Sequence, residues 1–501
     1  MFHYKKIFNN KKTLIIILSF LFALSVQKNF LFQGSDVLLI NSIKSLNFEK
    51  LSSDWVSTYT DHIPVYTYFN YLLINLFSIN IINLILISIL VLCSYSLFYI
   101  NNYFYNKLNS ENIFLWFAFF LFIFHEKSFF SGVAGQSILS HVYAPSIYGV
   151  LMFSSFAFFL YNRYFLSIFI LVLAVYFHPT YLIHSFFLFI GYIFYLIKNT
   201  KTKQLLIYSF FYAILIFPVV AYIYLNFLVD DKLVSIMARE ILVYKRIPHH
   251  ANINVWLSSK DFQSLAIIIF ALYLIRSNNK IFIPLSVVFG FSFSLSIIQY
   301  FIASNSLALA FPWRSSVFLM PLSSLLIFTY FLQSSNNYHV RYKYYYILTF
   351  LIVTSMFFIK SNLYLNDDNK NFKKKEPLYI YLKSKNKEID KLLLPLNIND
   401  IRLNTGIPIF VSWKYHPFKN SEILDWDKRI NLNKAFYSTT NFRNKIKTLE
   451  TIYIVDAISH FVIFKESDNN NFIEIFNKYF NYKKYYIYDY KSCNFIRLKN
   501  R

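Results

Sequence analysis

The chain has 501 residues, of which 56% are hydrophobic and only 15% are charged, and its mean hydropathy is +0.41. A soluble domain carries about 25% charged residues, so this composition excludes an ordinary soluble globular protein. The formal net charge is +24, yet no basic helix or aromatic RNA-binding motif accompanies it. We therefore expect cationic loops beside anionic lipid headgroups, and no nucleic-acid partner. The two cysteines, Cys93 and Cys493, predict neither a disulfide framework nor a zinc site.

Long apolar runs fill the chain up to about residue 360, and each run of roughly 20 residues predicts a transmembrane helix. His178-Pro179 divides one long run in two; such a break often marks a cavity, although a simple proline kink is the commoner cause. We expect about eleven spans, at 13–32, 80–100, 112–126, 143–162, 164–177, 180–197, 205–228, 262–275, 281–302, 314–333 and 344–360.

Lysine and arginine residues in alternate short loops predict the orientation of these spans. The N-terminal stretch MFHYKKIFNNKK and the loop at 198–203 are both basic, so we assign them to the cytoplasm. The apolar segment 63–79 would invert this order if it crossed, and we interpret it as a helix at the outer interface. An alternative for the first span is a cleavable signal peptide, because Ala23-Leu24-Ser25 offers small residues.

The chain becomes polar after the last span, which predicts three regions: a membrane domain at 1–360, a linker at 361–375 and an extracytoplasmic domain at 376–501. In the last region, short apolar runs alternate with helix-like stretches. We therefore expect an α-helical polytopic membrane protein with a small α/β C-terminal domain outside the cytoplasm. The helix-like stretches lie at 376–385, 421–437 and 471–480.

The first external loop gathers acidic residues that are scarce elsewhere in the membrane domain. Asp36, Asp54 and Asp61 lie there, with His62 next to the last of them. A carboxylate just outside the first span is suited to act as a general base or to hold a divalent cation. The alternative is loop solvation and helix capping, for which Asp54 is well placed after two serines.

The second large external loop contains cations and imidazoles close together. Lys245, Arg246, His249 and His250 are suited to bind a phosphate or pyrophosphate, and Arg314 lies at the outer end of a later span. Interfacial anchoring of these cations is the alternative. The paired histidines have no evident third ligand that would complete a metal site.

Several short motifs, spread over nearly the whole chain, carry a resemblance to a known family. With a carboxylate in a long first external loop, many spans and an external C-terminal domain, they resemble the C-type (GT-C) glycosyltransferases. Within that set the chain is similar to an uncharacterised family of bacterial multi-span membrane proteins. The motifs are Ser53-Asp54-Trp55, His178-Pro179, Arg246 to His250, Phe311 to Arg314, Asp400 to Leu403 and Pro408 to Pro417, with Trp426 and Arg429.

The resemblance implies a multi-pass glycosyltransferase of the bacterial plasma (inner) membrane. It would transfer a sugar from a polyprenyl-phosphate-linked donor to an acceptor on the extracytoplasmic face. Asp36 or Asp54 would be the catalytic carboxylate, although neither belongs to a paired acidic motif, and the cations of the second loop with Arg314 would hold the lipid phosphate. The residues expected to bind the acceptor or glycan are Asp61, His62, Arg402, Trp413, Lys414 and His416.

Two other functions fit the same composition. A lipid or glycan transporter (flippase) should carry ionisable residues inside its spans and internal repeats. The sequence has no charged residue in the middle of an apolar run and no clear repeat. A non-catalytic membrane protein of envelope assembly would instead use the external domain to bind a partner.

Overall fold

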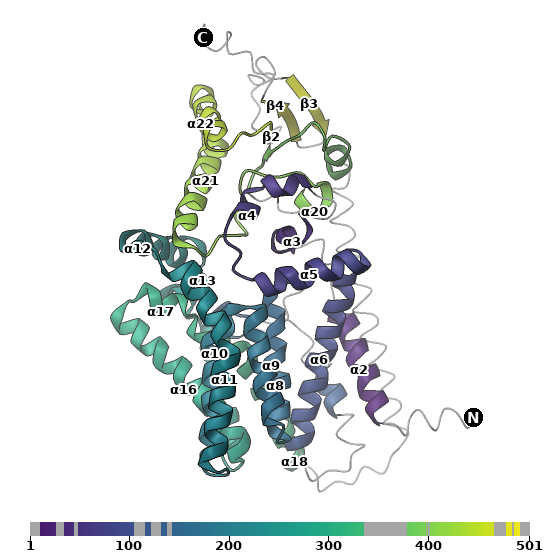
Figure 1. The fold of residues 1–501 in the computed structure, drawn as a ribbon, viewed down its shortest axis with the longest axis vertical. Coiled ribbons are helices and arrows are strands. Elements are labelled where there is room, and N and C mark those ends of the chain that lie inside the picture. Colours follow the sequence, from purple (N-terminus) through teal and green to yellow (C-terminus); the bar gives the residue numbers. More distant parts are fainter. Residues whose placement is uncertain are drawn as a thin grey trace, which may run out of the picture.

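The computed structural model shows a bundle of long helices that carries shorter helices and a small sheet domain at one end (Figure 1). The expected span at 344–360 and the linker at 361–375 lie outside the described residues, and of the span at 112–126 only 116–121 is described, as helix. The structure describes residues 11–26, 35–44, 49–104, 116–121, 132–137, 143–334, 378–396, 398, 401–464, 477–482 and 485–490.

The described bundle helices overlap nine of the eleven predicted spans, because apolar runs and the polar or proline residues between them set where each helix ends. Several of these helices are shorter than a membrane crossing requires, so the count of eleven spans stays a prediction. Five described stretches are long and apolar enough to cross a membrane: Ile81–Phe104, Pro179–Ile197, Thr202–Leu228, Asn279–Ile302 and Asn305–Phe331. The bundle consists of α2 (Lys11–Val26), α6 (Ile81–Phe104), α8 (Val150–Leu160), α9 (Tyr164–Phe177), α10 (Leu182–Ile197), α11 (Thr202–Ile223), α15 (Ser259–Ile275), α16 (Asn279–Ile302) and α18 (Ser316–Ser334).

Small residues let the bundle helices approach closely, as in other membrane proteins. A Cβ atom on Gly191 of α10 would lie 2.6 Å from the Cα atom of Pro284 in α16, so a larger side chain there would push the two helices apart. The hydroxyl groups of Ser96 and Ser154 lie 2.8 Å apart and join α6 to α8.

A buried lysine lies at the end of the bundle opposite the sheet domain, where a turn joins α8 to α9. Lys280, in the first turn of α16, donates a hydrogen bond to the Leu160 carbonyl oxygen at 2.8 Å. Its ammonium group lies 5.5 to 5.9 Å from the centres of four aromatic rings, which stabilise the cation. This is the end that the sequence assigns to the cytoplasm.

Short helices cover the opposite end of the bundle. The helix expected from segment 63–79 is α5, and it lies across the bundle axis instead of along it (Figure 1), as expected for a helix at the interface. The helices of this end are α3 (Ser35–Ile43), η2 (Glu49–Ser53), α4 (Trp55–Thr58), α5 (Pro64–Phe77), η3 (Val133–Gly135), η4 (Pro145–Gly149), η5 (Pro179–Tyr181), η6 (Tyr224–Leu228), α12 (Lys232–Glu240), η7 (Ile241–Arg246), α13 (Pro248–Ala251), α14 (Ile253–Trp256), α17 (Asn305–Leu309) and η8 (Pro312–Ser315).

The C-terminal domain is a four-stranded sheet with helices beside it, the small α/β fold expected from its sequence. The strand order is β1-β2-β4-β3, with β1 parallel to β2 and the other two pairs antiparallel. Tyr437 of α21 donates to the Val462 carbonyl oxygen at 2.7 Å, which packs that helix against β2. The elements are β1 (Leu392–Leu393), α20 (Ile401–Thr405), α21 (Asn420–Ser438), α22 (Phe442–Val455), β2 (His460–Phe464), β3 (Asn477–Tyr482) and β4 (Tyr485–Asp489).

One predicted element of this domain is wrong and another was missed. A helix was expected at 471–480, but residues 477–480 belong to strand β3, which pairs with β4. Tertiary pairing outweighs the weak local helix preference of this stretch. Helix α22 was not expected, although Ile446, Leu449 and Ile452 recur at helical spacing and are buried.

Candidate functional site

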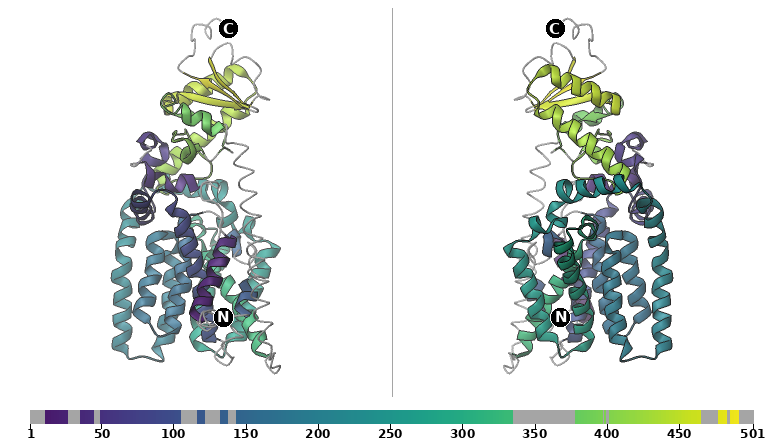
Figure 2. Two further views of the ribbon diagram at one scale, coloured as in Figure 1. Left: turned by 90° about the vertical axis from the view of Figure 1, so that its right-hand side faces the viewer. Right: turned by 90° about the vertical axis from the view of Figure 1, so that its left-hand side faces the viewer.

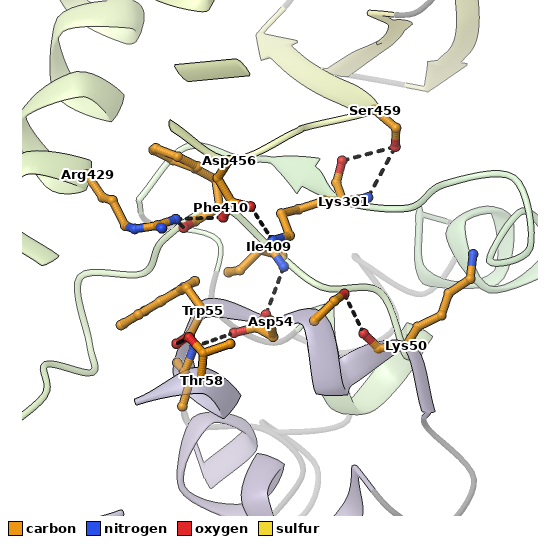
Figure 3. A network of polar contacts seen from close by, with 12 residues as sticks. Lys50, Asp54, Trp55, Thr58, Lys391, Ile409, Phe410, Arg429, Asp456 and Ser459 are labelled. Atoms are coloured by element: carbon orange, nitrogen blue, oxygen red, sulfur yellow. Dashed lines mark hydrogen bonds and ion pairs between the residues drawn. The ribbon is translucent and has the colours of Figure 1, made fainter. Parts of the chain in front are cut away.

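The two long loops that the sequence assigns to the outside, the first external loop at 33–62 and the second at 229–261, meet the C-terminal domain at one end of the bundle (Figures 1 and 2). Their firmest contact is a buried ion pair between Asp54 of the first loop and Arg402 of α20, both of which are fully buried. Arg402 donates from Nε to Asp54 Oδ2 at 2.8 Å and from Nη2 to Oδ1 at 3.1 Å. Asp54 also accepts hydrogen bonds from the backbone N–H groups of Val56, at 3.0 Å, and Ile409, at 2.9 Å (Figure 3).

These four hydrogen bonds bear on two predictions. A carboxylate has about four lone-pair positions, so Asp54 has none left for the hydroxyl of an acceptor. Its surroundings favour a structural role, as the cap of α4 and the clamp between loop one and the C-terminal domain, over that of a catalytic base. Arg402, expected to bind acceptor or glycan, is buried in the same clamp.

A second group of contacts involves Arg429 and Asp456, which Figure 3 shows near Asp54. The Tyr59 hydroxyl donates to the carboxylate of Asp425. Arg429 donates to Asp425 at 2.9 Å and to Asp456 at 2.6 Å, which ties α21 to the loop after α22. Burial and the Asp425 carboxylate raise the pKa of Tyr59, so its hydroxyl stays protonated as a donor.

The second external loop is also bonded to the C-terminal domain. Lys245 forms an ion pair with Asp427 at 2.5 Å and donates to Asn431 at 2.8 Å, so this cation, expected to bind lipid phosphate, is already paired. Thr60 of the first loop donates its backbone N–H and its hydroxyl to Glu422, at 2.9 and 2.7 Å. The external loops and the domain are thus joined at several places.

Six further side chains form a cluster that we call the cationic ring, because each lies close enough to two others for their positive charges to repel. Charge on either arginine lowers the pKa of His250, and charge on Arg246 or His62 lowers that of His416. His178 lies in the same way between His62 and Arg314. The members of the ring therefore come from loop one, the α9–η5 junction, the second external loop, η8 and the C-terminal domain. Its members, in order, are Arg314, His250, Arg246, His416, His62 and His178.

Local sequence explains how the membrane end presents these groups. His178 ends α9 in an extended conformation because Pro179 starts the next turn. Arg314 lies in η8, which begins at a proline that follows Phe311 in the left-handed conformation, at φ 48°. A non-glycine residue in that region is strained, and such strain is often found at functional sites.

Neutral groups hold the ring in place. Arg314 donates to the Gln136 side-chain oxygen at 2.5 Å and lies 5.3 Å from the centre of the Tyr181 ring. Arg246 donates to the Lys414 carbonyl oxygen at 2.7 Å and lies 5.8 Å from the centre of the Trp413 ring. Lys414 thus contributes its backbone carbonyl oxygen to the site, and Trp413 lies against the guanidinium group of Arg246.

The ring has unused polar atoms. Within the described ranges, the buried Nε atoms of Arg246 and Arg314, Nδ1 of His178 and Nε2 of His416 have no hydrogen-bond partner. Neither arginine forms an ion pair with any carboxylate in the part of the chain that the structure describes. Buried polar groups are normally satisfied, so an oxyanion with several acceptor oxygens fits this position.

The charge of the ring at neutral pH lies mainly on its arginines. Burial lowers the pKa of His62 to about 3 and that of His250 to about 4, and it lowers the pKa of His416 well below its usual range. Burial also lowers the pKa of Arg246 to about 10, which still leaves it charged. A bound anion would raise the histidine pKa values, because a nearby negative charge favours the imidazolium form.

Of the other loop-one carboxylates, Asp61 lies next to the ring. Its Oδ1 accepts from the Ile63 N–H at 2.9 Å, and its carboxylate is in electrostatic contact with Tyr415, whose hydroxyl lies 3.4 Å from His62 Nδ1. Asp36 is the second residue of α3, and its side chain lies outside the described part of the structure.

The ring contains more than the sequence predicted. The sequence did not single out His178 or Gln136 as site residues, yet both take part in the site. His249 stands beside the ring, its imidazole 4.1 Å from that of His250. Among the described residues, no group of three His, Cys, Asp or Glu side chains is placed to hold a metal ion.

One comparison with known proteins bears on this region. Residues 376–432 match a family described as Domain of unknown function (DUF6798). The matched stretch contains β1, α20 and the first part of α21, and with them Arg402 of the clamp and His416 of the ring. None of the curated proteins matches the chain.

Proposed function

We propose that this chain is a membrane glycosyltransferase of GT-C-like architecture, with about eleven spans and an extracytoplasmic C-terminal domain. It would transfer a sugar from a polyprenyl-phosphate-linked donor to an acceptor outside the cytoplasm. The cationic ring carries the proposal, because its two arginines have no carboxylate partner among the described residues. The bundle helices expose large apolar side chains that suit a lipid tail, while the ring suits the phosphate attached to it.

In this mechanism the ring binds the lipid phosphate and the first loop supplies the base. Arg246 and Arg314 offset the negative charge that develops on the phosphate as its bond to the sugar breaks. Asp61 takes the proton from the attacking acceptor hydroxyl, since it is the described loop-one carboxylate nearest the ring that is not used by the clamp. Asp36, which the resemblance names, is the alternative base.

One observation favours a second function, the binding of a lipid phosphate without sugar transfer, as in envelope assembly or lipid transport. Asp54, which the resemblance also names as the base, is fully bonded inside the fold.

Three single variants, Arg314→Gln, Asp61→Asn and Asp36→Asn, together with one control, separate the two functions. In cells, Arg314→Gln should abolish the surface glycan that depends on this protein and should also abolish binding of vesicles that contain polyprenyl monophosphate. Asp61→Asn should lower transfer by about a hundredfold or more but leave vesicle binding intact, because a general base acts only in the chemical step. The control is Arg276→Gln, since Arg276 stacks on Tyr273 outside the ring.

The outcomes are distinct. Unchanged glycan in both Asp61→Asn and Asp36→Asn would refute the enzyme and favour the binding function, provided that Arg314→Gln still fails to bind. Normal binding by Arg314→Gln would refute the phosphate site itself.

A further inference from the structure

A small cavity lies beside η7, the helix that carries Arg246 of the cationic ring. Its volume is about 110 Å³, and it opens between the second external loop and the outer ends of α16 and α17. None of the described side chains that line it is charged, so it differs in kind from the cationic ring. Its polar lining consists of amides and hydroxyls, chiefly those of Tyr244, Asn252, Asn254, Gln299, Tyr300 and Asn305.

The amides of this cavity are held in defined positions. Gln299 is only 5% exposed, and its Nε2 donates to the Ala251 carbonyl oxygen at 2.7 Å, which leaves its Oε1 as an acceptor at the wall. Asn252 accepts the Asn254 N–H on its Oδ1 at 3.1 Å and thus keeps its amide hydrogens for a ligand. The wall therefore offers both donors and acceptors.

Two uncommon backbone conformations shape the walls. Helix η7 is a π-helix, a rare form that is frequent at functional sites, and it directs Tyr244 to the cavity and Arg246 to the ring. On the facing side, Ala303 ends α16 in the left-handed conformation, at φ 50°, which alanine adopts only with strain. Strain of this kind persists where the surrounding structure holds it in place.

From this lining we infer that the cavity binds an uncharged sugar ring, at a site separate from the cationic ring. Sugar hydroxyls both donate and accept hydrogen bonds, as side-chain amides do. The tyrosine rings offer an apolar surface to the C–H face of a sugar. A lipid tail would leave the amides unsatisfied. The cavity is partly open to the surface, so it can hold one edge of a small sugar ring while the rest stays outside, and it is too small for a drug-sized molecule.

The test uses the full chain in a detergent without a sugar headgroup, with N-acetylglucosamine and glucose as probes. Saturation-transfer NMR should show binding in the millimolar range for at least one probe. Asn254→Leu and Asn305→Leu should each weaken it by about fivefold to tenfold, as expected for one lost hydrogen bond. Arg314→Gln should leave it unchanged, so that failure of the phosphate site and failure of the sugar site are distinguishable.

A second measurement needs no variant. N-acetylglucosamine that bears a diazirine, photoactivated on the wild-type protein, should label peptides that contain residues 243–254 or 299–308. Labelling only elsewhere, no binding of either probe, or equal binding by wild type and both leucine variants would overturn the inference.

Discussion

The clamp between Asp54 and Arg402 allows a sharp test of whether Asp54 is structural or catalytic. Both side chains are fully buried, and the carboxylate accepts two hydrogen bonds from the guanidinium group. Replacing Asp54 with asparagine leaves the Arg402 cation buried without a counter-charge. The loss of one partner of a buried ion pair costs about 3–5 kcal/mol.

Other variants of the clamp refine that magnitude. Asp54→Ala should cost more than Asp54→Asn, because it also removes the acceptor for the Val56 and Ile409 N–H groups. A lost helix cap costs about 1 kcal/mol and an unsatisfied buried N–H about 1–3 kcal/mol. Arg402→Met should cost about as much as Asp54→Asn. The double variant should cost less than the sum, with a coupling of about 2 kcal/mol, because no lone charge remains.

Tryptophan fluorescence during urea unfolding is a suitable assay. Trp55 and Trp426 are buried where loop one meets the C-terminal domain, so they report on its release. The control is Glu388→Gln, which breaks an exposed ion pair of Lys385 and Glu388 at 2.7 Å in the same domain. That variant should shift the free energy of unfolding by less than about 1 kcal/mol.

The reasoning would be refuted if Asp54→Asn unfolded at the wild-type urea midpoint. If the same variant also lost glycan transfer, Asp54 would be the catalytic base after all.

Other predictions concern the ring and the bundle. Because burial keeps the His62 and His250 imidazoles neutral in the folded protein while the unfolded chain protonates them below about 6.5, stability should fall from pH 7 toward pH 4. The midpoint temperature of thermal unfolding, plotted against pH, should show this fall in stability. His250→Gln should make the dependence of the midpoint temperature on pH weaker. Gly132→Ala should cost about 1–3 kcal/mol, because its methyl group would meet α18, whereas Gly290→Ala meets nothing within 4 Å and should be harmless in the same melting assay. Lys280→Met should cost about 1–3 kcal/mol in that assay, since it removes the donor to the carbonyl oxygen of buried Leu160 at the α8–α9 turn.

The membrane helices were predictable from sequence because the signal is local. An apolar run and the break that ends it lie within one stretch, as at His178-Pro179, where α9 stops one residue before the expected break. The sheet domain was harder. Whether 477–480 becomes strand or helix depends on its pairing with residues 487–489, which no local pattern reveals.

The site was predictable only in part, and for a physical reason. The second external loop revealed Arg246 and His250 because its cations lie together in sequence. Asp54 and Arg402 are 348 residues apart, so nothing local could show that the carboxylate is used by a buried partner. His178 and Gln136 belong to the site only because segments distant in sequence pack together, so no local pattern could predict their roles.

The acidic residues of α21 have a further consequence for whatever enters the ring. Glu422 accepts hydrogen bonds from loop one, Asp425 from Tyr59 and Arg429, and Asp427 is paired with Lys245. Among the residues that the structure describes, an incoming oxyanion would therefore have no carboxylate to displace from the ring arginines. Its competitors would then be the small anions of the surrounding solution. The fraction of cationic rings that hold a phosphate headgroup should thus depend on the kind and concentration of buffer salt. Sulfate should displace a weakly held headgroup more effectively than chloride.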